Sequence, residues 1–264
     1  MDFTKMHGLG NDYIFLNCME STPDNLGELA RRLSDRHFGV GGDGIICICP
    51  SDRADFRMRM FNADGSEGAM CGNGIRCFGK YVYERGLTDK QHLTIETLAG
   101  ERELSLMVRE KRVHAAVVDM GIPILKPPAL LRIGEGKYTA IPVSMGNPHA
   151  VIEVDDPAAL DLQSVGPAVE NHPAFPGRVN AEFIRVLNRT ELQMRVWERG
   201  SGETMACGTG ACASACAMMD AGKLDREVVV HLSGGDLAVR WDEKSGHVFM
   251  TGPAAAVFDG KLDN

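Results

Sequence analysis

Two cysteines stand in the same local setting at two distant points of the chain. Cys71 is followed by Gly72-Asn73-Gly74, and Cys207 is followed by Gly208-Thr209-Gly210, each time before an apolar stretch with helical spacing. A thiol at a helix N-terminus faces unpaired N–H groups and the positive end of the helix dipole, which favour the thiolate. The glycines let a ligand approach the backbone, whose N–H groups can bind a carboxylate.

Two such thiols on opposite sides of one carbon atom are suited to stereoinversion. One thiolate removes a proton from one face, and the opposite thiol delivers a proton to the other face. The α-proton of an amino acid is only weakly acidic, so helix N-termini aimed at its carboxylate would stabilise the developing charge. Closure of the site would exclude water and strengthen this effect. We therefore expect an enzyme that needs neither a cofactor nor a metal ion.

An internal repeat relates these two cysteines. The 136-residue separation of Cys71 and Cys207 recurs where Gly10-Asn11 matches Gly146-Asn147 and where Met58–Phe61 matches Met194–Trp197. A single cysteine before a helix is usually structural, because cysteine is among the most buried residue types. Two cysteines at equivalent points of a repeat favour a shared function instead.

The predicted elements alternate between strands and a few helices. We predict strands over Ile45–Cys49, Phe56–Phe61, His92–Thr97 and Glu103–Val108, and helices over Ile75–Arg85 and Ala211–Ala221. A further helix is expected after Thr22, with Pro23 at its first position. The Ala211–Ala221 segment has almost no polar face, which is typical of a buried helix.

These elements predict an α+β fold rather than a doubly wound sheet. We expect two pseudosymmetric lobes from an internal duplication, each a strongly curved β-sheet wrapped round a central helix, with the active site in the cleft between them. The N-terminal lobe is expected over residues 1–115, with the tail 253–264 packing back on it. The C-terminal lobe is expected over residues 116–252.

The composition of the chain limits the classes of partner that it can bind. The chain has 264 residues, a formal net charge of −8 and a pI near 5.5, which argues against a nucleic acid or an anionic membrane as partner. No signal-like or membrane-spanning segment is recognisable, so we expect a cytoplasmic protein whose eight cysteines are reduced. The cysteines form no C-x-x-C pair, which disfavours a structural zinc site.

One glycine-rich motif has the spacing of a dinucleotide-binding site but lies in the wrong structural context. Gly39–Gly44 matches the G-x-G-x-x-G pattern of dinucleotide sites. In those sites the glycines follow a strand and open a helix. Here they follow a predicted helical stretch and lead into a predicted strand, so we interpret the motif as a loop.

Longer motifs around these residues resemble one enzyme family. Phe61–Glu67 leading to Cys71, Met145–His149, Val179-Asn180, and Glu198–Glu203 leading to Cys207 resemble diaminopimelate epimerases, and the resemblance runs from Lys5–Asp12 to the tail. It implies a cofactor-independent homodimeric enzyme that interconverts LL- and meso-2,6-diaminopimelate by a two-base mechanism. Such an enzyme serves the biosynthesis of lysine and peptidoglycan precursors.

The resemblance also implies roles for single residues. Cys71 and Cys207 would be the acid–base pair, with Cys71 donating and Cys207 accepting in one direction. His149 and Glu198 would tune the thiol pKa values. The implied substrate-binding residues are Asn11, Asn62, Gly72, Asn73, Asn147, Asn180, Glu198, Arg199, Gly208 and Thr209. Arg199 is suited to bidentate capture of a distal carboxylate.

The chain departs from the family pattern at two positions. Gly44 stands where many members carry a side-chain amide, and Phe258 stands where an aromatic hydroxyl is common at the dimer contact. The first departure puts one substrate contact in doubt, and the second puts the detail of the dimer in doubt.

Three other functions are considered. Proline racemases and hydroxyproline epimerases also use two cysteines, but their first motif is usually Cys-Gly-His-Gly and they lack the Glu198-Arg199 pair. A non-catalytic amino-acid binder would need the asparagines and helix N-termini but no thiols. A redox dithiol would oxidise to a disulfide, and we expect oxidation to inactivate this protein.

Overall fold

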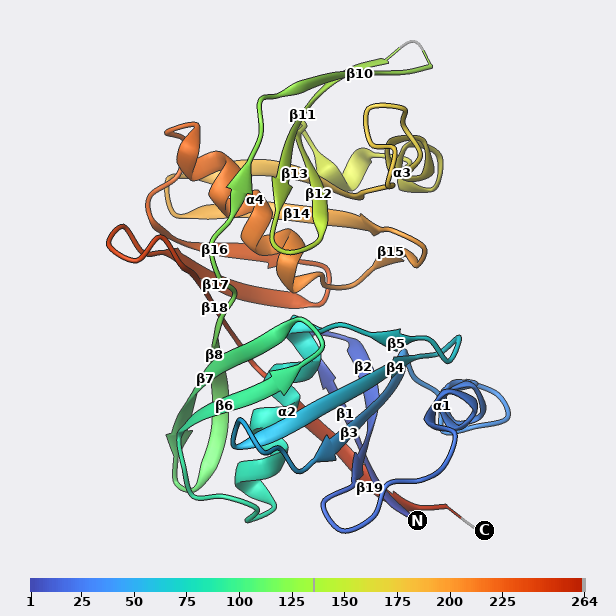
Figure 1. Ribbon diagram of the computed structural model, residues 1–264. Coiled ribbons are helices and arrows are strands. Elements are labelled where there is room, and N and C mark those ends of the chain that lie inside the picture. The colour runs from blue at the N-terminus through green and yellow to red at the C-terminus, as the bar shows by residue number, and fades with distance from the viewer. Residues whose placement is uncertain (135, 263–264) are drawn as a thin grey trace. The chain divides into compact units, whose positions relative to one another are not determined.

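The chain folds into two compact units, which are described separately. The computed structural model describes residues 1–134 and 136–262. The first unit comprises Met1–Val118 together with the C-terminal segment from Gly252, and the second comprises Asp119–Thr251. Each unit is built mainly of strands with two α-helices (Figure 1), so the predicted α+β class is confirmed.

The first unit contains one sheet and helices α1 (Leu26–Ser34) and α2 (Gly72–Glu84). Its strands are β1 (Asp2–Gly8), β2 (Asn11–Asn17), β3 (Gly44–Cys49), β4 (Phe56–Asn62), β5 (Glu67–Gly68), β6 (His92–Thr97), β7 (Gly100–Arg109), β8 (Arg112–Asp119) and β19 (Ala255–Lys261). The strand order is β19-β1-β2-β3-β4-β6-β7-β8, with β5 added to β4. The β2–β3 and β4–β6 pairs are parallel and the others are antiparallel.

The second unit repeats this arrangement. Its helices are α3 (Leu162–Glu170), α4 (Gly208–Asp220) and the short 3₁₀ helix η1 (Pro157–Ala159). Its strands are β9 (Ile124–Leu125), β10 (Ala129–Ile133), β11 (Gly136–Ser144), β12 (Pro148–Glu153), β13 (Asn180–Asn188), β14 (Glu191–Glu198), β15 (Gly202–Thr204), β16 (Glu227–Leu232), β17 (Gly235–Trp241) and β18 (Val248–Gly252).

The strand order of the second unit supports the predicted duplication. It is β10-β11-β12-β13-β14-β16-β17-β18, with β15 added to β14 and β9 to β11. The parallel pairs, β12–β13 and β14–β16, fall at the same places in the order as those of the first unit. The same strand directions therefore occur in both units, and the connections agree except at the edge strands β19 and β10.

The central strands are covered by helices on both faces. All six residues of β3 are buried, and its run of Ile and Cys has no polar side, as expected for a strand with two covered faces. Ile45, Cys47 and Cys49 belong to the core that α1 closes. The next residue in the alternation, Ile46, lies instead against Gly74 of α2. Helix α2 thus lies on the opposite face of the sheet from α1 (Figure 1).

Helix α4 has the same place in the second unit. Eleven of its thirteen residues are buried, which agrees with the apolar pattern of the predicted helix. Ala181 and Phe183 of β13 pack in the core that α3 closes, whereas Glu182 between them lies against Gly210 of α4. Strand β13 therefore presents a carboxyl group to the buried helix.

The predicted start of the first helix is wrong. We expected Pro23 at the first helical position, but α1 begins at Leu26. Asn25 precedes it in the left-handed conformation, with φ near 50°, and its side chain accepts a hydrogen bond from the amide of Glu28. This cap satisfies an N–H group at the helix start and leaves Pro23 outside the helix.

The C-terminal strand completes the sheet of the first unit. Strand β19 runs antiparallel to β1, with Asp2 opposite Lys261 and Lys5 opposite Phe258. The rings of Phe3 and Phe258 meet edge to face with centroids 5.9 Å apart. The tail thus covers an edge that β1 would otherwise expose.

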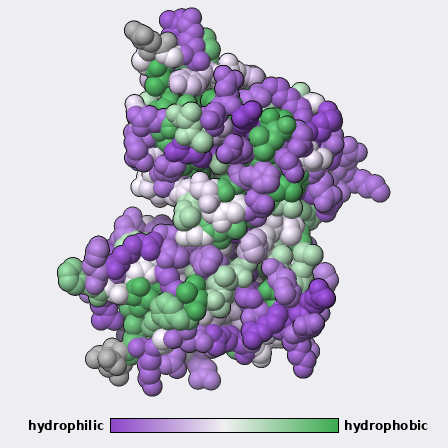
Figure 2. All heavy atoms as spheres, turned by 180° about the vertical axis from the view of Figure 1, so that it is seen from behind, coloured by the Kyte–Doolittle hydropathy of each residue, from purple (hydrophilic) through white to green (hydrophobic). Residues whose placement is uncertain are grey.

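One face of the molecule is mostly hydrophilic. On the face shown in Figure 2, polar side chains predominate and hydrophobic residues form small patches between them. No helix in the described part of the chain is long and apolar enough to cross a bilayer.

Candidate active site

Cys71 caps the N-terminus of α2. Its backbone is extended, and its Sγ accepts a hydrogen bond from the amide of Gly74 at 3.3 Å. The Cys71 thiol donates to Oδ1 of Asn11 at 3.2 Å, and the Asn73 side chain donates to the same oxygen at 3.4 Å. The Asn11 amide in turn donates to Asp43 at 2.7 Å. Three predicted site residues, Asn11, Cys71 and Asn73, are therefore brought together.

Tyr13 is a member of this group that the sequence analysis missed. It lies two residues beyond Asn11 on β2, is buried, and its hydroxyl hydrogen-bonds to the side chains of Cys71 and Asn11. Burial raises the pKa of Tyr13 well above its ordinary value, and the neighbouring Cys71 adds to the shift. Tyr13 is thus a neutral hydrogen-bonding partner of Cys71. Its position is equivalent to that of His149 in the repeat, which is the signal that could have found it.

Cys207 caps α4 in the same way. Its Sγ accepts a hydrogen bond from the amide of Gly210 at 3.4 Å, and its side chain lies 3.5 Å from Oγ1 of Thr209. The Asn147 amide donates to the same Thr209 oxygen at 3.2 Å. Cys207 is 5% exposed. The second half of the chain therefore also holds a thiol against the first turn of a buried helix.

The charges around Cys207 raise its pKa. Burial is the largest cause, and the carboxyl groups of Glu198 and Glu182 add to it, so the pKa lies well above the ordinary 9.0. Glu198 hydrogen-bonds to the thiol and accepts a 2.5 Å hydrogen bond from Thr204. Burial also raises the pKa of the Glu198 carboxyl group. Cys207 is therefore a neutral thiol in the absence of a substrate.

His149 lies on β12 beside this group and bonds to a residue that sequence reasoning missed. Its Nδ1 is 2.7 Å from Oε1 of Glu182, and its Nε2 is 3.0 Å from Oδ1 of Asn147. His149 and Glu182 are both fully buried. The signal for Glu182 was a carboxylate within a strand whose neighbours are apolar.

The remaining polar residues form a second group in the same unit. Asn180 at the start of β13 donates to the carbonyl of Pro148 at 3.1 Å and accepts from the amide of Arg199 at 2.8 Å. The exposed Arg199 guanidinium donates to the carbonyl of Gly177 at 3.2 Å. The amide of Gly200 donates to the buried Glu170. These bonds fix the turn that carries Glu198 and Arg199.

Asn62 and Gly44 lie opposite each other on the paired strands β4 and β3. The Asn62 side chain donates to Ser66 at 3.0 Å in the turn between β4 and β5. A Cβ atom at Gly44 would lie 2.1 Å from the carbonyl oxygen of Phe61. The backbone here therefore leaves no room for a side chain at position 44.

The other glycines singled out in the sequence lie at the starts of helices or lead into a strand. Gly72 and Gly208 are the first residues of α2 and α4, next to the capping thiols. The Gly39–Gly44 motif leads into β3 and opens no helix. Within residues 1–134 and 136–262, no cluster of three His, Cys, Asp or Glu side chains is arranged to hold a metal ion.

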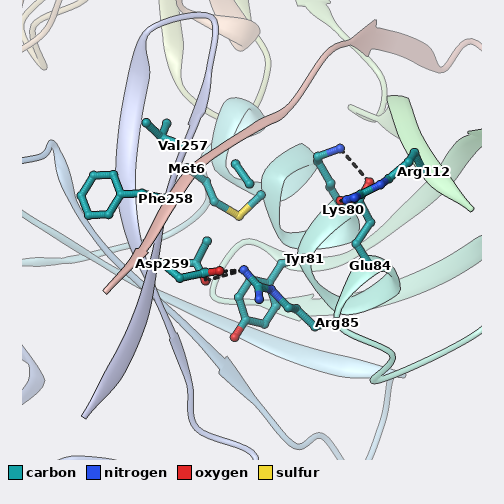
Figure 3. A pocket seen from close by; sticks show the side chains of 11 residues that line it. Met6, Lys80, Tyr81, Glu84, Arg85, Arg112, Val257, Phe258 and Asp259 are labelled. Carbon is teal, nitrogen blue, oxygen red and sulfur yellow. Dashed lines mark hydrogen bonds and ion pairs between the residues drawn. The ribbon is translucent and has the colours of Figure 1, made fainter. Parts of the chain in front are cut away.

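A cavity of about 290 Å³ in the first unit contains none of the predicted site residues. It lies between the C-terminal half of α2 and strands β1 and β19 (Figure 3). The charged groups that line it pair with one another: Lys80 and Arg112 with Glu84, and Arg85 with Asp259. Three cations and two carboxylates thus line the cavity, and each of these charged groups already has an ion-pair partner.

Known proteins resemble the whole chain. The family model described as diaminopimelate epimerase matches residues 3–126 and 141–257. The diaminopimelate epimerase of Acetivibrio thermocellus is 52% identical over 276 residues, covering 100% of this chain and 99% of the relative. That of Methanococcus maripaludis is 48% identical, with full coverage of both chains.

Solved structures share the fold at low sequence identity. A phenazine biosynthesis protein of the PhzF family from Bacillus anthracis matches with a TM-score of 0.79 and 19% identity, covering 100% of this chain and 99% of that one. A hydroxyproline epimerase from Agrobacterium vitis, with bound trans-4-hydroxy-L-proline, matches with a TM-score of 0.74 and 14% identity, covering 99% and 90%. With the family match and the full-length relatives, the chain belongs to the diaminopimelate epimerase family.

Proposed function

We propose that this protein is an amino-acid epimerase that interconverts LL- and meso-2,6-diaminopimelate without a cofactor. The observation that carries the proposal is the equivalent placement of two thiols, Cys71 and Cys207, as N-caps of buried helices at equivalent points of a duplicated fold. The names of the full-length relatives supply the substrate.

The reaction exchanges one proton for another at a single carbon. With Cys207 as thiolate, its sulfur takes the α-proton, so that a C–H bond breaks and an S–H bond forms. The Cys71 thiol then gives its proton to the opposite face of the carbanion. The enzyme is left with the two protonation states exchanged, and the reverse reaction starts from that form. Exchange with solvent protons restores the first form.

Backbone groups stabilise the charge that develops on the substrate. The first turns of α2 and α4 present amide N–H groups next to the thiols, and glycines keep this backbone accessible. Bound to the α-carboxylate, these groups lower the barrier to carbanion formation. Asn11, Asn73, Asn147 and Thr209 line the same turns and complete the polar surroundings of the reacting carbon.

The far end of the substrate is recognised in the second unit. Arg199 and Asn180 are fixed by the hydrogen bonds of the Glu198–Gly200 turn, and the exposed guanidinium is suited to a carboxylate. Asn62 is assigned to the amino or carboxylate groups of the same substrate. The presence of Glu198 and Arg199 favours a diacid over proline or hydroxyproline, although the fold is shared with a hydroxyproline epimerase.

The proposal is tested by deuterium exchange. We expect LL-diaminopimelate incubated with the protein in deuterated water to gain deuterium at one α-carbon as meso-diaminopimelate forms. We expect L-proline to gain none. Deuterium in proline but not in diaminopimelate would overturn the substrate assignment.

Cysteine variants test the mechanism with a matched control. Cys71→Ala and Cys207→Ala each remove one acid–base group, so epimerisation should fall by at least a thousandfold. Cys216→Ala alters a buried thiol of the same helix α4 that has no part in the reaction, and it should stay within about threefold of the unaltered protein. An amino-acid binder without catalysis would show equal behaviour in all three variants.

Two further properties belong to the proposal. Both thiols must be reduced for the proton transfers, which suits the cytoplasm as the place of action. The homodimer implied by the family stays a prediction, and light scattering coupled to size-exclusion chromatography would measure it.

A further inference from the structure

A hydrogen-bonded line of side chains runs from Thr209 to Glu182 in the second unit. Thr209 Oγ1 receives the Asn147 amide at 3.2 Å, Asn147 Oδ1 lies 3.0 Å from His149 Nε2, and His149 Nδ1 lies 2.7 Å from Glu182 Oε1. His149 is 1% exposed and Glu182 is 0% exposed. Water therefore contributes little to the protonation of this pair.

These hydrogen bonds determine which atoms of His149 and Glu182 carry protons. An amide oxygen can only accept a hydrogen bond, so His149 Nε2 carries a hydrogen atom that points to Asn147. The 2.7 Å contact between Nδ1 and Oε1 also needs one proton. Whether that proton is on the imidazole or on the carboxyl group, His149 and Glu182 together have a net charge of zero.

The burial of Glu182 supports a retained proton. Its second carboxyl oxygen, Oε2, is buried and has no hydrogen-bond partner in the described part of the chain. A buried carboxylate that is neither paired nor fully hydrogen-bonded is costly. The proton shared with His149 removes this cost.

Glu182 also lies directly against the helix that carries Cys207. A Cβ atom at Gly210 would be 2.7 Å from Glu182 Oε1 and 3.3 Å from the Cβ of Cys207. In the first unit the equivalent Gly74 is packed in the same way against Ile46, whose Cδ1 would lie 2.6 Å from an added Cβ. The same place in the fold thus holds a carboxyl group beside Cys207 and a methyl group beside Cys71.

We infer that Glu182 is a positioning residue of the reaction, which holds His149 in its Nε2–H form and, through one shared proton, controls the ionisation of Cys207. The inference rests on the proposed function for its catalytic consequence. Glu182 itself does not touch the substrate; it acts through His149 and Cys207.

Four titratable groups from four elements face one another here: Glu182 on β13, His149 on β12, Glu198 on β14 and Cys207 at the start of α4. Ionised carboxyl groups of Glu182 and Glu198 both oppose a thiolate at Cys207. The proton that Glu182 shares with His149 offsets one of these charges. Cys207 can then ionise without becoming the third negative charge of a buried site.

The proton positions are measured directly by NMR of the protein labelled with ¹⁵N-histidine. The His149 signal is assigned by its loss in His149→Gln. We expect a protonated Nε2 across the neutral pH range and an Nδ1 that shares its proton. In Glu182→Gln, Nδ1 should become an unprotonated acceptor of the glutamine amide. An unprotonated Nε2 in the unaltered protein would overturn the inference.

The catalytic consequence is measured by two substitutions at Glu182. Glu182→Gln keeps the hydrogen bond to His149 and, like the neutral His149–Glu182 pair, carries no net charge, so the acid limb of kcat/KM should stay within about 0.3 pH unit of that of the unaltered protein. The same result is expected in both reaction directions, because the ratio of their kcat/KM values is the equilibrium constant. Glu182→Ile copies the residue of the first unit and leaves Nδ1 without a partner, so kcat/KM should fall at least tenfold.

The outcomes separate this inference from the proposed function. A pH profile that moves by about one unit or more in Glu182→Gln, with folding verified by thermal denaturation, would overturn the shared proton, and an unchanged kcat/KM in Glu182→Ile would overturn the positioning role of Glu182. Full activity in Cys207→Ala would overturn the proposed function instead. The histidine spectra depend on neither result, because they require no substrate.

Discussion

The side chains around Cys71 and Cys207 differ although the backbone around them is alike. At equivalent positions of the repeat, Asn11 and Asn147 are identical, but Tyr13, Ile46 and Asn62 of the first unit are replaced by His149, Glu182 and Glu198. The thiol of the second unit therefore has two carboxyl groups as neighbours. The ionisation of Cys207 responds to these charges, which have no counterpart at the equivalent positions of the first unit.

This difference predicts unequal reactivity of the two thiols. Cys71 is partly exposed, whereas Cys207 is 5% exposed and has a pKa well above 9.0. The thiolate is the species that reacts with iodoacetamide. We expect Cys71 to be alkylated at least tenfold faster than Cys207 at pH 8. The rate at Cys207 should still rise with pH above 9, because a raised pKa shifts the thiolate to higher pH.

Peptide mass spectrometry after timed alkylation measures both rates. Cys216, which is fully buried with its pKa raised to about 12, serves as an internal control that should stay unlabelled while the fold is intact. Equal rates at Cys71 and Cys207, or a Cys207 rate that levels off below pH 8, would contradict the assignment of a neutral resting thiol.

Sequence patterns could locate the thiols but not all of their partners. The two cysteines could be recognised because they occupy equivalent positions of the repeat and because each is followed by a Gly-x-Gly sequence. Glu182 and Tyr13 were missed because each lies within an apolar strand, where burial and not spacing determines its role. Comparison of Ile46 with Glu182 across the repeat adds a second signal of a carboxyl group buried at this place.

At the scale of elements, the first turns of α2 and α4 depend on their glycines. Gly74 and Gly210 donate their amides to the capping sulfur atoms, and each is packed against a side chain of the central strand behind it. Alanine is favoured over glycine within a helix by about 1 kcal/mol. At these two positions the added methyl group has no room, so the packing conflict outweighs the helix propensity.

We therefore expect both Gly74→Ala and Gly210→Ala to lower the free energy of unfolding by about 1–3 kcal/mol, as overpacked cores do. Gly210→Ala should also lower kcat/KM, because the methyl group displaces the Glu182 carboxyl group. Gly177→Ala is the control, since an added Cβ there meets no heavy atom within 4 Å. Urea denaturation measures the stabilities. A loss at Gly177→Ala equal to that at Gly210→Ala would contradict the packing argument.

The elements themselves were largely predictable. Strands such as Ile45–Cys49 and His92–Thr97 followed from apolar runs and alternation, and the buried helix from its lack of a polar face. The start of α1 was not predictable from Pro23. The Asn25 side chain forms the N-cap, so the helix begins three residues after Pro23, at Leu26. Helix boundaries depend on such single hydrogen bonds, which composition does not show.

At the scale of the whole molecule, the two units have the same strand order, but their equivalent edge strands come from different parts of the chain. In the second unit, β10 precedes its neighbour β11 directly in the chain. In the first unit, the equivalent place beside β1 is taken by β19 from the far end of the chain. The first unit is therefore complete only when the last segment has been made.

Removal of residues 253–264 tests this dependence. The truncation removes the β1–β19 pairing, the edge-to-face contact of Phe258 with Phe3, and the Pro253 carbonyl that accepts from the buried Arg76. Since each net hydrogen bond contributes about 1 kcal/mol, we expect a loss of about 3 kcal/mol or more in stability. Hydrogen exchange should quicken in β1, β2 and α2, while β12, β13 and α4 keep their protection.

The control is Lys261→Ala, which alters an exposed side chain and should change stability by less than about 0.5 kcal/mol. Equal loss of protection in both units would show that the tail supports the molecule as one cooperative body rather than the first unit alone.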